Sequence, residues 1–295
     1  MMPALQFLDD DSEPRPFVSP DQARVVILPV PLEKTVSYLT GTSAAPAAII
    51  NASRQVELFD PELDTSPYLA GIHTYPAAEC SGDTEEVLEA LRKKISSVTS
   101  AGQLPVCLGG EHTLTLAPVE VLSAKNPKLS ILHLDAHADF RRSYRGSRLS
   151  HACVMRRIFE LGPPSVSVGV RSLSEEEARF ISDNEIVLYP EWEFSERGYP
   201  WDEIVGRLSA EIYITIDMDV FDPAQVPAVG TPEPGGLGWH DALSLFRAIR
   251  DSGRRVAGFD LVELCPRVES AVSTFFAARL LYKMIGYFCL NRENS

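Results

Sequence analysis

Residues 129–139 read Leu-Ser-Ile-Leu-His-Leu-Asp-Ala-His-Ala-Asp, an apolar run that ends in acidic and histidine side chains. A second run of this kind, Ile-Tyr-Ile-Thr-Ile-Asp-Met-Asp, occupies residues 212–219. β-Branched and aromatic residues favour strands, and open α/β sheets bind ligands outside the carboxyl ends of their strands. Aspartates that converge there repel one another unless cations lie between them. The two runs therefore predict a metal site, and we expect it to hold two metals.

Strand-like and helix-like segments alternate along the chain. We expect strands at 24–30, 71–76, 104–108, 129–135, 165–170, 185–189, 211–217 and 255–261. We expect helices at 45–56, 84–98, 114–124, 150–161, 174–183, 201–208, 239–251 and 270–287. This alternation is typical of βαβ units in a mostly parallel sheet covered on both faces. A closed barrel is less favoured because the acidic strand ends are unevenly placed. We predict an α/β fold, a three-layer α/β/α sandwich.

The chain is expected to form a single domain. It has 295 residues, of which 45% are hydrophobic and 23% charged, as in ordinary globular proteins. Residues 1–20 are acidic and contain proline, so we expect a flexible amino-terminal arm. Residues 21–295 then make up the domain.

Charge and cysteine usage limit the partners and the compartment. A formal net charge of −14 argues against nucleic acid and suits a small cationic substrate, although solubility alone also explains it. No apolar run approaches the roughly 20 residues that span a bilayer, and the start lacks the features of a signal peptide. The five cysteines are scattered without a C-x-x-C pair, which indicates a reducing compartment. We expect a cytoplasmic protein without membrane contact.

A third motif, Leu-Gly-Gly-Glu-His-Thr at residues 108–113, follows another expected strand and places His112 where it can face the same pocket. A lone histidine of this kind is more often structural. Here it completes a set of candidate metal ligands: His112, Asp135, His137, Asp139, Asp217 and Asp219. Oxygen and nitrogen ligands without sulfur suit manganese, and less well iron, nickel or zinc. Two such ions about 3.5–4 Å apart can hold and ionise one water.

Three irregular segments are candidates for pocket walls. Residues 141–150 and 221–237 each follow an acidic cluster, and residues 38–46 contain a glycine-threonine loop. Loops at the ends of parallel strands commonly line binding sites. Simple connectors are the alternative, and the arginines of 141–150 are more often a solvated charged loop.

Four motifs in order resemble the signature blocks of the ureohydrolases, the family of arginase and agmatinase: Gly-Gly-Glu-His, Asp-Ala-His-Ala-Asp, Asp-Met-Asp-Val-Phe-Asp-Pro and Asp-Leu-Val-Glu-Leu-Cys-Pro. The resemblance spans roughly residues 24–287. It implies an arginase-like α/β/α sandwich with a central eight-stranded sheet and a centre of two Mn²⁺ ions. It also implies hydrolysis of a guanidino group to urea and an amine, in a homo-oligomer, a trimer or a hexamer.

The resemblance also assigns roles to individual residues. One metal would be held by His112, Asp135, Asp139 and Asp217, and the other by Asp135, His137, Asp217 and Asp219, so that Asp135 and Asp217 bridge. Asp139 would also accept a hydrogen bond from the attacking hydroxide. Glu263 matches the residue that binds the planar guanidinium through two parallel hydrogen bonds. His151 matches a histidine that passes a proton to the departing amine. Glu111 and Glu269 stand where the family usually has aspartate, and neither is an expected ligand.

The segment after Asp139 resembles the agmatinase branch. Arginases carry asparagine and serine groups near a Gly-Asn-x-His-Gly segment there, which hold the amino acid, whereas residues 148–157 of this chain read Arg-Leu-Ser-His-Ala-Cys-Val-Met-Arg-Arg. The expected reaction is agmatine to putrescine plus urea. N1-aminopropylagmatine is an alternative, and arginine is a less favoured one. Guanidinobutyrate is another, and it would need a cation for its carboxylate among Arg141, Arg142, Arg145 and Arg148.

Two other classes of protein remain open. A one-zinc deacetylase can share this sheet, but the bridging aspartates and Glu263 argue against it. A non-catalytic metal-binding descendant is the other, although such proteins commonly lose ligands.

Among other residues, we interpret His133 as a packed core histidine and Arg171 as a partner in a structural ion pair. We do not expect Cys153 to act as a nucleophile with His151, since residues two apart on a helix do not face each other.

Overall fold

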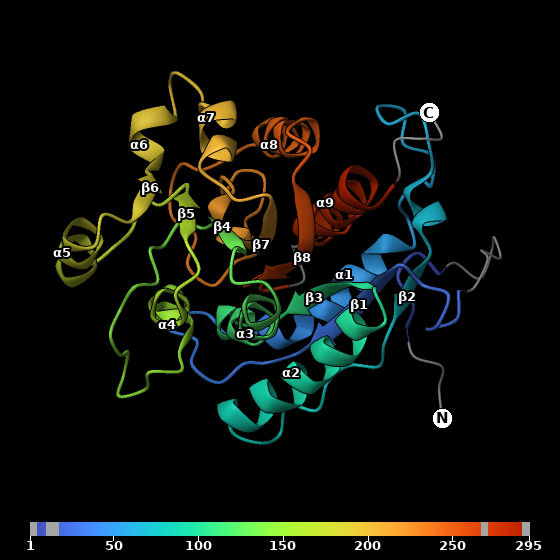
Figure 1. The fold of residues 1–295 in the computed structure, drawn as a ribbon, viewed down its shortest axis with the longest axis horizontal. Helices are drawn as coiled ribbons and strands as arrows, with labels where there is room; N and C mark the ends of the chain where they lie inside the picture. The colour runs from blue at the N-terminus through green and yellow to red at the C-terminus, as the bar shows by residue number, and fades with distance from the viewer. Residues whose placement is uncertain (1–4, 10–17, 267–270, 291–295) are drawn as a thin grey trace.

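The protein is built around one eight-stranded sheet, seen in the computed structural model in Figure 1. The structure describes residues 5–9, 18–266 and 271–290. The strands are β1 (Val25–Val30), β2 (Ile72–Thr74), β3 (Leu104–Gly109), β4 (Ser130–Leu134), β5 (Ser165–Val168), β6 (Val187–Tyr189), β7 (Glu211–Asp217) and β8 (Arg255–Val262). They pair in the order β2-β1-β3-β8-β7-β4-β5-β6, and every pairing is parallel. The predicted strands are confirmed.

Helices cover both faces of the sheet. The α-helices are α1 (Ala45–Ser53), α2 (Thr84–Ser100), α3 (Leu116–Lys125), α4 (Val154–Leu161), α5 (Glu175–Asp183), α6 (Glu191–Phe194), α7 (Trp201–Gly206), α8 (Trp239–Asp251) and α9 (Ala271–Cys289). Helices α1, α7, α8 and α9 form one layer, and α2, α3 and α4 pack together on the other side (Figure 1). The predicted three-layer α/β/α sandwich is confirmed; the short α6 was not predicted.

The strands are apolar on both faces because both faces are covered. Successive strand side chains point to opposite sides, so β1 contributes Val25 and Ile27 to one core and Val26 and Leu28 to the other. All six residues of β1 are buried. A strand buried on both faces has a continuous apolar sequence, and this is why the eight strands could be predicted from the sequence.

Local signals set several helix ends. Asp83 accepts a hydrogen bond from the amide of Glu86, and this capping box starts α2 at Thr84. A second capping box at Ser174 starts α5. The expected helix at 150–161 differs at its beginning, because His151–Cys153 form a 3-10 turn and the α-helix starts at Val154.

The predicted arm falls largely outside the described residues, which exclude 1–4 and 10–17. Within the arm, Phe7 and Leu8 are buried, and the amide of Leu8 donates to Ser53 Oγ at 2.7 Å. Glu269 also lies outside the described residues.

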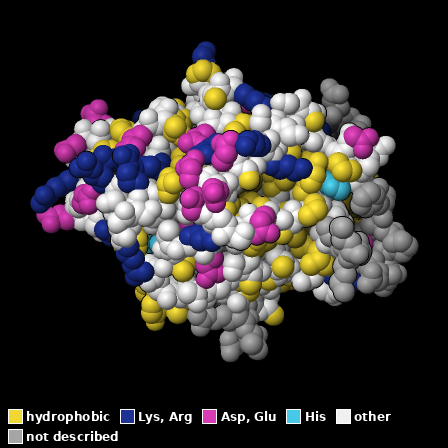
Figure 2. Space-filling view, turned by 90° about the horizontal axis from the view of Figure 1, so that it is seen from below, with side chains coloured by type: hydrophobic (Ala, Val, Ile, Leu, Met, Phe, Trp, Pro, Cys, Tyr) yellow, Lys and Arg dark blue, Asp and Glu magenta, His cyan; other side chains and the backbone are white. Residues whose placement is uncertain are grey.

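Acidic and basic side chains are interleaved on the face shown in Figure 2. Arg92 of α2, for example, pairs with Glu85 and Glu120. Among the described residues, no helix combines the length and the apolar character needed to cross a membrane.

Candidate metal centre

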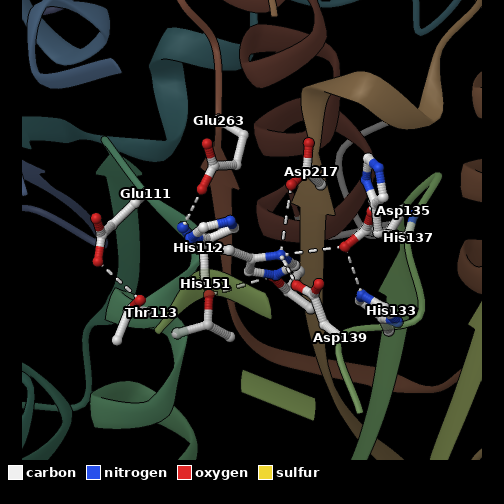
Figure 3. A network of polar contacts seen from close by, with 12 residues as sticks. Glu111, His112, Thr113, His133, Asp135, His137, Asp139, His151, Asp217 and Glu263 are labelled. Carbon is white, nitrogen blue, oxygen red and sulfur yellow. Dashed lines mark hydrogen bonds and ion pairs between the residues drawn. The ribbon is translucent and has the colours of Figure 1, made fainter. Parts of the chain in front are cut away.

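The expected site residues lie at one edge of the sheet. Strands β3, β8, β7 and β4 are consecutive neighbours in its centre. His112 follows β3, Glu263 follows β8, Asp217 ends β7 and Asp135 follows β4. Because the strands are parallel, their carboxyl ends meet, and residues far apart in the sequence converge there (Figure 3).

A first group of ligand atoms surrounds Nδ1 of His112. This nitrogen lies 3.2 Å from Asp135 Oδ2, 3.3 Å from Asp139 Oδ2 and 3.5 Å from Asp217 Oδ2. Two atoms that bind one divalent ion at about 2.1 Å lie about 3.0–3.4 Å apart. His112 Nδ1 is buried without a hydrogen-bond partner among the described residues. The group therefore has the spacing and the unused lone pair that a bound ion requires.

The hydrogen bond of the other ring nitrogen of His112, Nε2, determines which of the two nitrogens carries the proton. Nε2 lies 2.8 Å from the hydroxyl of Thr215, which donates to Asp260 Oδ1 at 2.6 Å. A hydroxyl has one proton to donate, so Thr215 accepts from His112 Nε2–H. The lone pair of the neutral ring is then on Nδ1, which faces the carboxylates. Partners of this kind orient metal-binding histidines.

A second group forms around His137. Its Nδ1 lies 2.9 Å from Asp219 Oδ2 and 3.6 Å from Asp135 Oδ1. Asp135 thus directs one oxygen to each group, the arrangement expected of a bridging carboxylate. Asp217 is placed differently: its Oδ2 faces His112, whereas its Oδ1 accepts the amide of Asp219 at 2.9 Å. These contacts place Asp217 in the first group, and its expected role as a second bridge stays a prediction.

The electrostatics of the cluster indicate an excess of negative charge. Burial, together with Asp219 and Asp135, raises the pKa of Asp217 well above its usual value. Burial also opposes ionisation of Asp135, but hydrogen bonds from His112, His133 and His137 hold its pKa below the usual range. Cations would relieve the repulsion that raises the pKa of Asp217. The residues present fit a cation-binding centre.

Glu263 approaches the cluster through a strained turn. Its φ of 61° lies in the left-handed region, which a non-glycine residue rarely adopts. Its amide donates to Gly110 O at 2.8 Å, and its Oε1 accepts the amide of His112 at 2.7 Å. Burial raises the pKa of Glu263 to about 8. Two interactions hold the residue, while its side chain also lines the cavity next to the cluster.

That cavity has a volume of about 260 Å³ and contains the expected substrate-binding residues. Asp139, His151, Asp217, Asp219 and Glu263 all line it. Burial lowers the pKa of His151, although the negative charges of Asp139 and Glu111 oppose this. All three irregular segments expected to form pocket walls contribute to the lining, through Tyr38, Leu39, Arg141, Tyr144, Gly230 and Thr231. Val36 and Ser37, just before the first segment, also line it.

Comparisons with known proteins identify the family of the chain. The family model described as "Arginase family" matches residues 23–286. The chain belongs to the arginase family. It is 37% identical to an N(1)-aminopropylagmatine ureohydrolase of a Synechocystis species, over 96% of this chain and 94% of the relative. It is 36% identical to an agmatinase of Pyrococcus horikoshii, over 92% and 94%. The crystal structure of agmatine ureohydrolase of Thermoplasma volcanium has a TM-score of 0.84 at 33% identity, covering 91% of each chain.

Arginase-family membership confirms the resemblance drawn from the four sequence motifs, the expected fold and the assignment to a family of hydrolases. The structure adds a buried cluster of histidines and aspartates that could bind metal.

Sequence reasoning missed the role of His133 in this arginase-family site. The residue is fully buried, as expected of a core histidine, but it is not merely packed. Its Nε2 lies 2.9 Å from Asp135 Oδ2, and its Nδ1 lies 3.0 Å from Ser167 Oγ. Both nitrogens are engaged, so His133 orients Asp135. The signal was available, because residues two apart on a strand share a face.

Arg171 also differs from the prediction. Among the described residues, it donates hydrogen bonds to main-chain carbonyls rather than to a carboxylate: those of Gly169, Val220, Asp219 and Glu233. It ties the segment after β7 to the end of β5. Cys153 is buried, and burial raises its pKa to about 11, which agrees with the expectation that it is not a nucleophile.

Proposed function

We propose that this chain is a binuclear manganese hydrolase that cleaves the guanidino group of agmatine to give putrescine and urea. The observation that carries the proposal is the position of Asp135, whose two oxygens face two separate groups of ligand atoms. A carboxylate between two groups suits two ions close together. His112, Asp135, Asp139 and Asp217 would hold one ion, and Asp135, His137, Asp217 and Asp219 the other.

The chain's own residues would position the reactants. Glu263 would bind two N–H groups of the planar guanidinium, which places the guanidinium carbon beside the carboxylate cluster. When bound, the ions would lower the pKa of a water between them and stabilise the developing charge. Asp139 would accept a hydrogen bond from the attacking water. As the carbon–oxygen bond forms and the carbon–nitrogen bond breaks, His151 would pass a proton to the leaving nitrogen.

The loop after Asp139 supports a substrate without a carboxylate. Guanidinobutyrate would need a cation there, but three of the four loop arginines have partners. Arg141 Nε lies 3.7 Å from Glu177, Arg148 pairs with Glu160 at 2.9 Å, and Arg145 donates to the carbonyls of Val36 and Ser37. The net charge of −14 also suits a dicationic substrate such as agmatine.

N1-aminopropylagmatine is the second candidate, since it has the same guanidinium end and one more cationic amine. The cavity wall includes Tyr38, which is 73% exposed, so the cavity reaches the surface and would leave room for a longer amine. A relative 37% identical to this chain bears the name of an enzyme for that compound.

Urea release from a panel of guanidino compounds, with manganese added, tests the proposal. We expect kcat/KM to be highest for agmatine, followed by aminopropylagmatine, guanidinobutyrate and arginine. Arginine exceeding agmatine by about tenfold, a difference of about 1.4 kcal/mol, would refute the substrate assignment. A manganese-loaded protein that binds agmatine and releases no urea would instead support the non-catalytic descendant. One zinc per chain would support the deacetylase.

We also propose a cytoplasmic homo-oligomer, a trimer or a hexamer. Light scattering coupled to size-exclusion chromatography tests the oligomeric state, and a monomer at micromolar concentration would contradict it.

A further inference from the structure

Glu111 connects the metal centre to an amino-terminal loop. The residue adjoins His112, is fully buried, and was expected only to be a variant of the family's usual aspartate. Its Oε2 accepts the amides of Lys34 and Thr35, each at 2.7 Å. Its Oε1 accepts the hydroxyl of Thr113 at 2.8 Å and lies 3.1 Å from the hydroxyl of Thr35. The carboxylate therefore holds the loop by its main chain and contacts the side chain of Thr35.

The hydroxyl of Thr35 stands between Glu111 and His151. Its oxygen lies 3.1 Å from Nδ1 of His151, and it accepts the main-chain amide of His151 at 3.2 Å. The hydroxyl of Thr35 donates its single proton to Oε1 of Glu111. The remaining lone pair can then accept only from an Nδ1–H group. The contacts are mutually consistent when His151 carries its proton on Nδ1.

Two further neighbours limit the His151 ring. Ser150 Oγ lies 3.4 Å from the same Nδ1, and the Tyr144 ring stacks edge-to-face at 5.7 Å. Nδ1 is thus occupied on the side of Thr35, and the ring is held in one orientation. His151 lines the cavity together with Asp139 and Glu263, so Nε2 is the nitrogen left to exchange a proton there.

We propose that Glu111 and Thr35 are positioning residues that hold His151 in the Nδ1–H tautomer, so that Nε2 exchanges the proton of the reaction. This inference rests on the proposed function. Nε2 takes a proton derived from the attacking water and gives it to the leaving nitrogen, and the ring returns to its starting state. The wrong tautomer would present an N–H where a lone pair is needed, and proton transfer would slow without a change in guanidinium binding.

Thr35→Val and Thr35→Ser form a matched pair. Valine keeps the shape of threonine and removes the hydroxyl, whereas serine keeps the hydroxyl. General acid–base catalysis contributes about 10²–10⁴-fold. We therefore expect Thr35→Val to lower kcat on agmatine by about a hundredfold, with KM within about twofold. Thr35→Ser should retain kcat within about fivefold, and metal content per chain should match the wild type in both variants.

Nitrogen-15 NMR of the imidazole rings, with the protein loaded with a diamagnetic divalent ion, reads the tautomer without any turnover. The His151 signals are assigned by their loss in His151→Asn. We expect a protonated Nδ1 in the wild type and in Thr35→Ser, and a shift towards protonated Nε2 in Thr35→Val.

A wild-type His151 protonated on Nε2, or a Thr35→Val protein with wild-type kcat, would overturn the inference. A wild type that keeps Nδ1–H but releases no urea from any guanidino compound would refute the proposed function and leave the tautomer assignment standing.

Discussion

The hydroxyl oxygen of Thr215 lies 2.8 Å from Nε2 of His112, and both residues are buried beneath the candidate metal centre. Behind it, the buried carboxylate of Asp260 accepts hydrogen bonds from the hydroxyls of Thr215, Thr115 and Tyr213. These residues come from three different elements, and the orientation of the candidate ligand His112 depends on their packing. Thr215, which does not line the cavity, thus determines how the candidate ligand His112 directs its lone pair.

Thr215→Val should weaken metal binding. Valine removes the acceptor for His112 Nε2–H, so the ring loses its preferred tautomer and orientation, and loss of such partners typically costs 10–100-fold in affinity. Competition titration with a metal chelator measures the constant. Thr215→Ser keeps the hydroxyl and should bind metal within about threefold of the wild type. Equal affinity of the valine and serine variants would show that Thr215 does not orient His112.

Asp217→Asn should abolish metal-dependent activity and yet stabilise the metal-free protein. The folded-state pKa of Asp217 is raised, so the folded protein holds this proton more tightly than the unfolded chain does. The free energy of unfolding of the metal-free wild type then falls as pH rises from the ordinary carboxyl range towards that raised value. Asparagine removes this cost, so the stability advantage of the variant should grow with pH.

Thermal unfolding of the metal-free proteins at about pH 5 and about pH 8 measures this effect. Manganese should then raise the melting temperature of the wild type and leave that of Asp217→Asn nearly unchanged. An Asp217→Asn protein that binds two manganese ions with full activity would remove Asp217 from the ligand set.

Much of this site could be predicted because its residues stand at the ends of apolar runs. Asp135 and Asp217 follow the buried strands β4 and β7, and the parallel order of the sheet brings them together. The sequence could not reveal that Asp217 directs only one oxygen to His112, because this depends on the turn at 218–220. The contacts of Arg171 could not be predicted either, since three of the four carbonyls it binds lie 48–62 residues away in the sequence.

The contacts between the site and the amino-terminal loop could not be predicted from the sequence either. Thr35 belongs to no motif among the quoted signature blocks, and it meets His151 across 116 residues of sequence. Buried Phe7 and Leu8 were overlooked because the acidic composition around them indicates an exposed arm.

The efficiency of the enzyme should rise with pH through about 8. Burial raises the pKa of Glu263 to about 8, so below this pH its carboxyl is protonated in the free enzyme. A protonated carboxyl lacks the charge that attracts a guanidinium, so kcat/KM should increase by up to about tenfold per pH unit and then level off. Agmatine kinetics from about pH 6 to about pH 10 measure the profile.

Glu263→Gln is the control for this assignment. Glutamine keeps the shape but has no carboxylate to ionise, so KM should rise and the inflection near pH 8 should disappear. If the variant keeps the same inflection, the titrating group is another residue.

Gly110→Ala should damage both stability and the site, because the turn after β3 has no room for a side chain. A Cβ atom at Gly110 would lie 2.0 Å from the carbonyl oxygen of Leu32, so the main chain must move. That carbonyl accepts the amide of Glu111, and the carbonyl of Gly110 accepts the amide of Glu263. We expect a loss of about 2 kcal/mol in the free energy of unfolding and a large fall in kcat/KM.

The matched control is Gly206→Ala at the end of α7, where an added Cβ meets no atom within 4 Å. Alanine is the better helix former, so this variant should gain up to about 1 kcal/mol and keep wild-type activity. Denaturation by urea measures the free energy of unfolding of both variants. Activity is measured separately, without denaturant, by detecting the amine product. A Gly110→Ala protein as stable and active as Gly206→Ala would mean that the turn can relax without displacing Glu263. The hydrogen bond between Gly110 after β3 and Glu263 after β8 would then not be needed to position the substrate.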